Sequence, residues 1–185
     1  MLAIVCPGQG SQTPGFLDPW LELPGLRDLL EALSDAASTD LVTHGRVSDE
    51  DTIKDTAVAQ PLLVGAGIVS LVALFGQGDD AGRLGGAKVV SGHSVGEYTA
   101  LACVSGVYEL EALLEVVFHR GSKMHDIVPR DAKGRSDYRL AAIRPSQIDL
   151  DDNDVTDFVA GIAEETGEFL QIVNFNLRGS QYAIA

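Results

Sequence analysis

The sequence predicts an α/β fold in which a larger part built on parallel strands is followed by a smaller part. An apolar run at residues 2–6 ends in a Gly-rich loop, and a second run at residues 87–90 ends in a Gly-rich pentapeptide and a helix-like stretch of small residues. Loops at the ends of parallel strands are where α/β folds place ligands. Residues 138–185 change to the pattern strand, helix, strand, turn, strand, the order in which a ferredoxin-like subdomain begins.

The composition fits a cytoplasmic domain of ordinary size. The chain has 185 residues, of which 45% are hydrophobic, and a formal net charge of −14. Nucleic acid is not expected as the main partner of so acidic a chain. Cys6 and Cys103 lie in apolar runs and are interpreted as buried thiols of a reducing compartment, not as a disulfide or a metal site. The first six residues, followed at once by Pro7-Gly8, are too short for a signal peptide.

Residues 57–75 carry no charge over 19 positions, which is close to the length that spans a bilayer. We interpret them as a buried helix of a globular protein and expect no membrane partner, because neither flank carries a basic cluster. Pro61 marks the expected start, since Pro is favoured in a first helical turn. Gly65 and Gly67 leave a thin waist for close packing.

The remaining elements follow from periodicity and capping. Leucines at helical spacing predict an amphipathic helix over residues 25–37, and residues 38–47 are predicted as a loop. Ser48 is predicted to cap the next helix. The run at residues 2–6 is expected to form a fully buried strand. Further expected elements are helices over 97–103, 108–124 and 154–165, and strands at 140–143, 171–176 and 181–185.

The pentapeptide Gly92-His93-Ser94-Val95-Gly96 has the form of a nucleophile elbow. Ser94 would stand on a tight, strained turn between strand and helix. Glycine is expected on both sides, because the two backbones pass too close for a Cβ. The helix N-terminus would direct free N–H groups at an oxyanion. An ordinary Gly-rich turn is the alternative interpretation.

The loop Pro7-Gly8-Gln9-Gly10-Ser11-Gln12 ends the first predicted strand. It carries two side-chain amides and no bulky side chain. A ligand-binding loop and a plain polar turn are both consistent with this composition.

Arg120 lies on the apolar stripe of the helix predicted over residues 108–124, one turn after Val116 and Val117. A guanidinium on an inward face needs an anionic partner, because an unpaired buried charge is very costly. The residues alone leave two partners open: a protein acid in a structural ion pair, or a substrate carboxylate bound by two hydrogen bonds.

Five motifs together resemble the malonyl-CoA:acyl-carrier-protein transacylase family. The resemblance implies an α/β-hydrolase-like parallel sheet subdomain with an inserted ferredoxin-like small subdomain, both incomplete. Residues 1–137 would be the N-terminal part of the large subdomain, and residues 138–185 the start of the small one. The motifs cover nearly the whole chain in the family's order: Pro7-Gly8-Gln9-Gly10-Ser11-Gln12, Ala59-Gln60-Pro61, Gly92-His93-Ser94-Val95-Gly96-Glu97-Tyr98, Arg120-Gly121 with Met124, and Asn174-Phe175-Asn176.

Carried over residue by residue, the resemblance implies that Ser94 is the catalytic nucleophile and carries the acyl group as an ester. Gln9 and the backbone N–H of Val95 would form the oxyanion hole, and Arg120 would bind the free carboxylate of malonyl. Four further motif residues would lie near the cleft: His93, Gln60, Asn174 and Asn176.

The two halves of the chain resemble different members of the family. Residues 1–75 are similar to free-standing actinobacterial transacylases, whereas residues 91–185 are similar to the malonyl/palmitoyl transferase domain of fungal and mycobacterial type I fatty acid synthases. The change falls near the Gly-rich residues 76–86, which are expected to form an exposed connection. A mosaic or engineered origin is an open alternative, and acyl selectivity is open between malonyl and long acyl chains.

The resemblance also places the general base, a His in a Phe-His-Ser type motif, further along the chain than residue 185. The four histidines of the sequence do not match that position: His44, His93, His119 and His125. We therefore expect the chain to be a fragment of an acyltransferase that is inactive or impaired alone.

The expected reaction moves a malonyl group from CoA to the phosphopantetheine thiol of an acyl carrier protein, in fatty acid or polyketide synthesis. It uses a CoA thioester as substrate and needs no metal or redox cofactor. The alternatives are a serine hydrolase or thioesterase of similar fold, or an inactive fragment that lacks the catalytic His.

Overall fold

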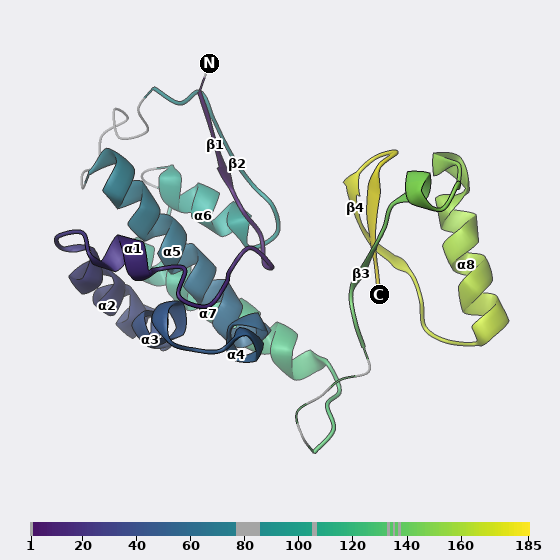
Figure 1. The fold of residues 1–185 in the computed structure, drawn as a ribbon, viewed down its shortest axis with the longest axis horizontal. Helices are drawn as coiled ribbons and strands as arrows, with labels where there is room; N and C mark the ends of the chain where they lie inside the picture. Colours follow the sequence, from purple (N-terminus) through teal and green to yellow (C-terminus); the bar gives the residue numbers. More distant parts are fainter. Residues whose placement is uncertain (1, 77–85, 105–106, 133, 135, 137) are drawn as a thin grey trace. The chain divides into compact units, whose positions relative to one another are not determined.

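The computed structural model describes residues 2–76, 86–104, 107–132, 134, 136 and 138–185. The chain divides into two compact units, Met1–Ile127 and Val128–Ala185 (Figure 1). The predicted connection at residues 76–86 lies outside the described residues except at its two ends. The division into a large subdomain at 1–137 and a small one at 138–185 stays a prediction.

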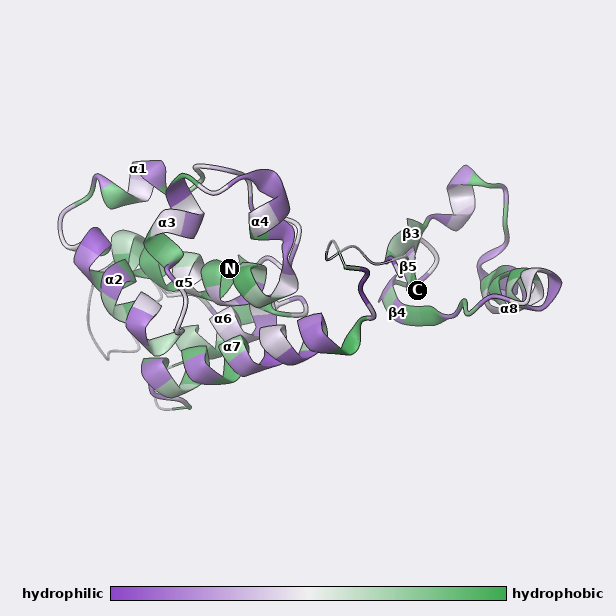
Figure 2. Cartoon of the chain, turned by 90° about the horizontal axis from the view of Figure 1, so that it is seen from below, coloured by the Kyte–Doolittle hydropathy of each residue, from purple (hydrophilic) through white to green (hydrophobic). Residues whose placement is uncertain are grey.

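The first unit combines a parallel sheet with helices, so the α/β class predicted from the sequence is confirmed. The longest helix, α5, packs against α2, α3, α6 and α7, and Figure 2 shows that hydrophobic residues concentrate along it. In chain order the elements are β1 (Ala3–Cys6), α1 (Asp18–Leu21), α2 (Leu26–Ala36), α3 (Leu41–Arg46), α4 (Glu50–Lys54), α5 (Thr56–Phe75), β2 (Val89–Gly92), α6 (Gly96–Cys103) and α7 (Leu110–Ile127).

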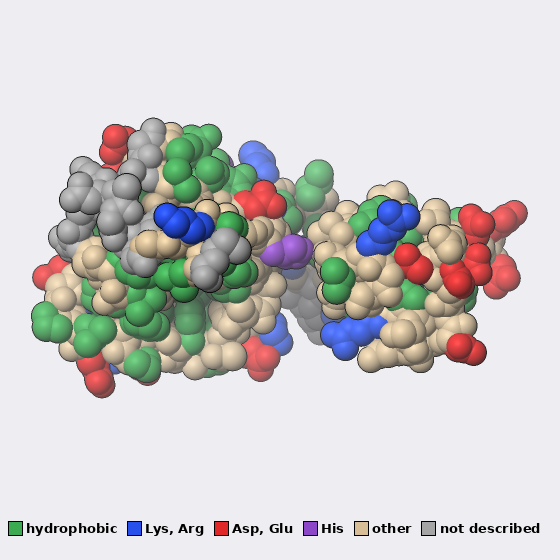
Figure 3. Space-filling view, turned by 90° about the horizontal axis from the view of Figure 1, so that it is seen from above, with side chains coloured by type: hydrophobic (Ala, Val, Ile, Leu, Met, Phe, Trp, Pro, Cys, Tyr) green, Lys and Arg blue, Asp and Glu red, His purple; other side chains and the backbone are tan. Residues whose placement is uncertain are grey.

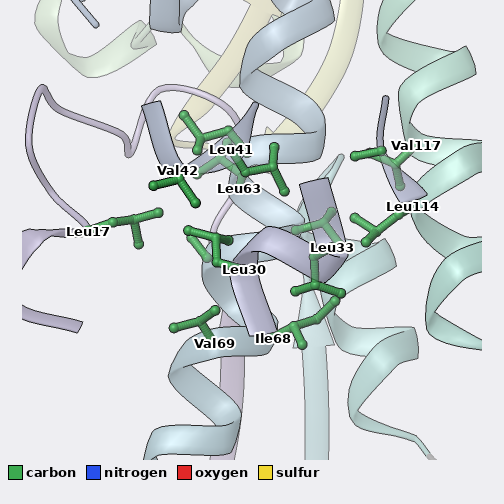
Figure 4. Close-up of a cluster of buried hydrophobic side chains, with 14 of the residues drawn as sticks. Leu17, Leu30, Leu33, Leu41, Val42, Leu63, Ile68, Val69, Leu114 and Val117 are labelled. Carbon is green, nitrogen blue, oxygen red and sulfur yellow. The ribbon is translucent and has the colours of Figure 1, made fainter. Parts of the chain in front are cut away.

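The core of this unit surrounds α5, and Figure 4 shows leucine and valine side chains of several helices meeting there. A Cβ on Gly65 would lie 2.8 Å from Leu41 Cδ1, and one on Gly67 would overlap the Thr99 methyl group. The predicted close packing at this waist is therefore confirmed. α5 is long and apolar enough to span a membrane, yet 67% of its most apolar stretch is buried inside the protein, in agreement with its interpretation as a core helix.

The predicted start of α5 was wrong, because an acidic cap precedes Pro61 by six residues. α5 begins at Thr56, and the side chain of Asp55 accepts a hydrogen bond from the Ala57 N–H at 2.9 Å. Pro61 lies inside the helix. A side-chain cap satisfies an N–H of the first turn, and here it outweighs the preference of Pro for that turn.

Capping also corrects the predictions for residues 38–51. Residues 38–47 contain α3 rather than a continuous loop, because Leu41 is fully buried and the Asp40 side chain accepts from the Thr43 N–H at 2.9 Å. The hydrogen bonds from the Thr43 side chain and backbone lower the pKa of Asp40. Asp49, not Ser48, caps α4.

The sheet of the first unit is covered on one face, so the prediction of a fully buried first strand was wrong. β1 and β2 pair in parallel, with Cys6 opposite Gly92. Along β1 exposure alternates: Cys6 is buried, whereas Val5 is 75% exposed. Such alternation is typical of a strand with one covered face, and α6 packs against both strands.

The second unit is an antiparallel sheet with one helix. β3 (Ala141–Ile143), α8 (Val155–Thr166), β4 (Ile172–Leu177) and β5 (Gln181–Ile184) follow the predicted order, with short 3₁₀ turns at Pro145–Gln147 and Asp152–Asp154. β5 lies between β3 and β4 and runs antiparallel to both, which is the arrangement of a split β-α-β unit. Figure 3 shows acidic side chains gathered at the end of this unit that contains α8.

We predict that Gly96→Ala destabilises the first unit by about 1–3 kcal/mol, because its Cβ would overlap the carbonyl groups of Cys6 and Pro7. Trp20 is the chain's one tryptophan and packs on the core of this unit, so its fluorescence in a urea titration measures the loss. Gly161→Ala in α8 is the control, because no atom lies within 4 Å of its Cβ position. An unchanged midpoint for Gly96→Ala would contradict the expected overlap.

Candidate active site

Ser94 stands at the tip of a sharp turn between β2 and α6. Its φ of 54° lies in the left-handed region, which costs a residue with a Cβ about 1–3 kcal/mol. The Gly96 N–H donates to the His93 carbonyl at 2.9 Å, and the Glu97 N–H donates to the Ser94 carbonyl at 3.1 Å. The turn therefore passes directly into the helix, which is the geometry of a nucleophile elbow.

Close backbone contacts exclude side chains on both sides of Ser94. A Cβ on Gly92 would overlap the Gly96 carbonyl, and one on Gly96 would overlap the carbonyls of Cys6 and Pro7. The predicted reason for both glycines is confirmed. The same contacts bring the end of β1 against the first turn of α6.

The N-terminus of α6 offers an unused donor beside Ser94. Val95 is the cap residue of α6, and its N–H has no acceptor among the described residues. The positive end of the helix dipole lies at the same place. An anion that formed at Ser94 would meet this N–H and this dipole end without displacing a hydrogen bond.

The loop at residues 7–12 runs beside the elbow. A Cβ on Gly8 would lie 2.8 Å from the His93 carbonyl and 3.0 Å from His93 Nδ1. The His93 side chain is exposed. Gln12 anchors the loop, because its buried Nε2 donates to the Ile53 carbonyl at 2.9 Å.

The Gln9 side chain is directed at the start of α5. Its Nε2 donates to the Lys54 carbonyl at 3.2 Å and to Thr56 Oγ1 at 3.4 Å. Both amide hydrogens are thus engaged. The backbone N–H of Gln9 has no acceptor among the described residues, so it is the freer donor of the two groups.

Arg120 projects from α7 and is half-buried. Its Nη1 donates to Oε1 of Gln60 on α5, and its guanidinium carbon lies 5.7 Å from the centroid of the Tyr98 ring. Gln60 is 1% exposed, and its Nε2 donates to Sδ of Met124 at 3.2 Å. In the part of the chain that the structure describes, no carboxylate lies within 4.0 Å of this guanidinium.

Tyr98 contacts Arg120 from the first turn of α6, the helix that directly follows the elbow. Ser94 itself precedes that helix and has a left-handed φ of 54°. Sequence reasoning quoted Tyr98 in the motif without giving it a role.

Gly121 allows α7 to approach the start of α5. A Cβ at this position would lie 2.7 Å from the Thr56 carbonyl and 3.3 Å from Ala57 Cα. One turn further along α7, Nδ1 of His125 lies 2.9 Å from the carboxylate of Asp55. Sequence reasoning missed this ion pair, because periodicity does not indicate which residues of two separate helices meet.

Two of the predicted site residues, Asn174 and Asn176, belong to the second unit. Both are exposed on β4, and their proximity to Ser94 stays a prediction. Cys6 and Cys103 are buried and form no disulfide, as expected, and a hydrogen bond with Cys103 lowers the pKa of Cys6. Within the described ranges, no group of three or more His, Cys, Asp and Glu is arranged to hold a metal ion.

The acyl transferase domain family matches residues 3–183 of the chain. Because the match spans nearly every residue, the chain belongs to the acyl transferase domain family. Within that family, individual transacylases are similar enough in sequence to be compared with this chain one by one.

The malonyl CoA-acyl carrier protein transacylase of Mycobacterium tuberculosis is 40% identical over 136 residues, which are 74% of this chain and 44% of the relative. The fatty acid synthase subunit beta of Saccharomyces cerevisiae is 34% identical over 140 residues, 75% of this chain and 7% of that relative. The predicted resemblance to both kinds of protein is thus confirmed.

A solved complex of a type II PKS acyl-carrier protein with its malonyl-transacylase matches with a TM-score of 0.75 and 29% identity. The match covers 98% of this chain and 53% of that one. The chain spans about half the length of the transacylases that it matches.

We predict that Ser94→Gly makes the first unit about 1 kcal/mol more stable than Ser94→Ala, because only glycine adopts a φ of 54° without strain. Both variants remove the hydroxyl, so their difference isolates the backbone. Urea titrations followed by Trp20 fluorescence give the comparison. Equal stability of the two variants would show that the turn relaxes when the serine is replaced.

Proposed function

We propose that this chain carries the acyl-enzyme site of a malonyl-CoA:acyl-carrier-protein acyltransferase, with Ser94 as nucleophile and Arg120 as the carboxylate-binding residue. The observation that carries the proposal is the neutral surroundings of Arg120. Among the described residues its contacts are an amide and an aromatic ring, which leave most of its five N–H donors for an anion. The similarity to malonyl transacylases indicates which anion this is.

In the first proposed step Ser94 Oγ attacks the thioester carbonyl of malonyl-CoA. The Oγ–C bond forms, the C–S bond breaks, the serine proton passes to a general base and CoA leaves as its thiol. Malonyl then remains as an ester on Ser94 with its carboxylate on Arg120. We keep the assignment of the base to a His in the Phe-His-Ser type motif of the family, as the resemblance implies.

In the second proposed step the phosphopantetheine thiol of a carrier protein attacks the Ser94 ester. The S–C bond forms, the Oγ–C bond breaks, and the thiol proton passes through the general base to the serine. A malonyl-transacylase has been solved with an acyl-carrier protein, which supports a carrier as the acceptor here. Transfer is preferred to hydrolysis because the relatives are transacylases. The proposed chemistry uses no metal or redox cofactor, and the proposed compartment is the cytoplasm.

For the oxyanion hole we propose the N–H of Val95 and the backbone N–H of Gln9. The Val95 N–H is free beside Ser94, and the Gln9 side chain is engaged by residues 54–56. This assignment moves the expected role of Gln9 from its side chain to its main chain. Two N–H groups converging on one oxygen are a common way to stabilise a tetrahedral intermediate.

We expect malonyl-CoA to add one malonyl group to this chain, and the Ser94→Ala variant to remain unmodified. The chain is incubated alone and with the separately produced C-terminal half of the Mycobacterium tuberculosis transacylase, and intact masses are recorded. The added half supplies the length that the relatives have in addition. If neither mixture labels Ser94, the acyltransferase proposal fails.

Arg120→Ala is expected to lower malonyl labelling at least about thirtyfold, while labelling by acetyl-CoA changes little, because only malonyl presents a carboxylate. The measured quantity is the ratio of the two initial rates in the same mixture. An equal loss for both thioesters would assign Arg120 a structural role instead. Glu111→Ala, at an exposed position of the same helix, serves as the control.

A further inference from the structure

Polar side-chain contacts join α5 and its cap residue to α7 on each side of Gly121. Arg120 bonds to Gln60 on one side, and His125 bonds to Asp55 on the other. The partners are equally spaced along the two helices and pair in opposite order, so the helices run antiparallel here. Between the two contacts Gly121 lies too close to the α5 backbone for a side chain.

Asp55 contacts both the first turn of α5 and His125 on α7. Its Oδ1 accepts from the Ala57 N–H at 2.9 Å and so caps α5. Both carboxylate oxygens lie 2.9 Å from His125 Nδ1. Since an ionised carboxylate only accepts, Nδ1 carries the proton in this pair.

The loop at residues 7–12 contacts the same region through the Gln9 side chain. Gln9 Nε2 bonds to the residues directly before and after Asp55, Lys54 and Thr56. Asp55 therefore lies between the loop proposed for the oxyanion hole and the helix that carries Arg120. The side chains of Asp55 and His125 are 28% and 32% exposed, so their contact is largely shielded from water.

We infer that Asp55 and His125 are positioning residues for the carboxylate site at Arg120, an inference that rests on the proposed function. Gln60 is buried on α5 and contacts α7 through both Arg120 and Met124, so sliding of α7 along α5 would displace the guanidinium from the Gln60 carbonyl. The Asp55–His125 pair resists such sliding, because it ties α7 to the capped, fixed end of α5. It thereby keeps the Arg120 guanidinium on Gln60 and over Tyr98, in the orientation that a malonyl carboxylate needs.

The test compares the dissociation constants of malonyl-CoA and acetyl-CoA by calorimetry. Ser94→Ala is present throughout, so that no ester forms, and the chain without a further change is called the unmodified chain. His125→Ala should lower the preference for malonyl-CoA roughly twofold to thirtyfold, the range found for residues that modulate a site without touching the ligand. His125→Asn should retain the preference, because the Asn amide N–H stands where Nδ1–H stood. Adding His125→Ala to Arg120→Ala should change the preference no further.

His44→Ala is the matched control, since His44 also uses Nδ1 in a half-buried contact, with Ser48 Oγ at 2.9 Å. It removes a similar interaction away from Arg120 and should leave the preference unchanged. The urea midpoint from Trp20 fluorescence shows whether each variant is folded. If His125→Ala does not fold, two other variants provide the test. His125→Asn should keep the preference of the unmodified chain, whereas His125→Gln, whose longer amide misplaces the donor, should lower it.

The outcomes separate the two claims. If the unmodified chain shows no preference for malonyl-CoA, or if Arg120→Ala keeps it, the proposed function fails and this inference with it. If Arg120→Ala removes the preference but His125→Ala and His125→Gln both keep it, the positioning role alone is overturned. Equal weakening of both thioesters by His125→Ala would also overturn it, because a purely structural role affects both alike.

Discussion

Gly92 and Gly96 have no side chain, which allows β1, β2 and α6 to meet. The position of Ser94 depends on this contact. Alanine at either position would drive the strand and the helix apart. The turn is also fixed by hydrogen bonds, from the His93 N–H to the Cys6 carbonyl at 3.3 Å and from the Gly96 N–H to the His93 carbonyl at 2.9 Å. A residue with a left-handed φ persists only when its surroundings impose it. The elbow is therefore strained. It is held at the carboxyl ends of β1 and β2, where the loop after β1 passes.

A second constraint concerns charge. A half-buried guanidinium without an acid nearby is unfavourable, because the hydrogen bonds that it made to water must be replaced by hydrogen bonds within the protein. Here an amide oxygen and an aromatic face replace only part of that hydration, and a cation–π contact of this kind contributes about 0.5–1 kcal/mol. The remaining donors favour binding of an anionic group. Arg120 itself thus contributes little to the stability of the fold and is suited to a carboxylate ligand.

Local features of the sequence predicted much of this, and contacts between distant segments were beyond it. The elbow was predictable because its glycines, its serine and its helix are neighbours in the chain. The inward face of Arg120 followed from helical periodicity, but its partners Gln60 and Tyr98 did not. Pro61 gave the wrong start for α5 because Asp55 provides a stronger cap, and the burial expected for residues 2–6 assumed a sheet covered on both faces. Asp55 and His125 are 70 residues apart, and no pattern in either segment indicates that they pair.

The central claim is that Ser94 and Arg120 form one site for a malonyl group. A crystal structure of the chain after reaction with malonyl-CoA, with the complementary half of the transacylase present where labelling requires it, tests this most directly. The account predicts an ester on Ser94 Oγ, with the free carboxylate about 2.7–2.9 Å from the Arg120 guanidinium nitrogens. An ester on Ser94 whose carboxylate faces solvent or another cation, with Arg120 still bonded only to Gln60, would contradict it.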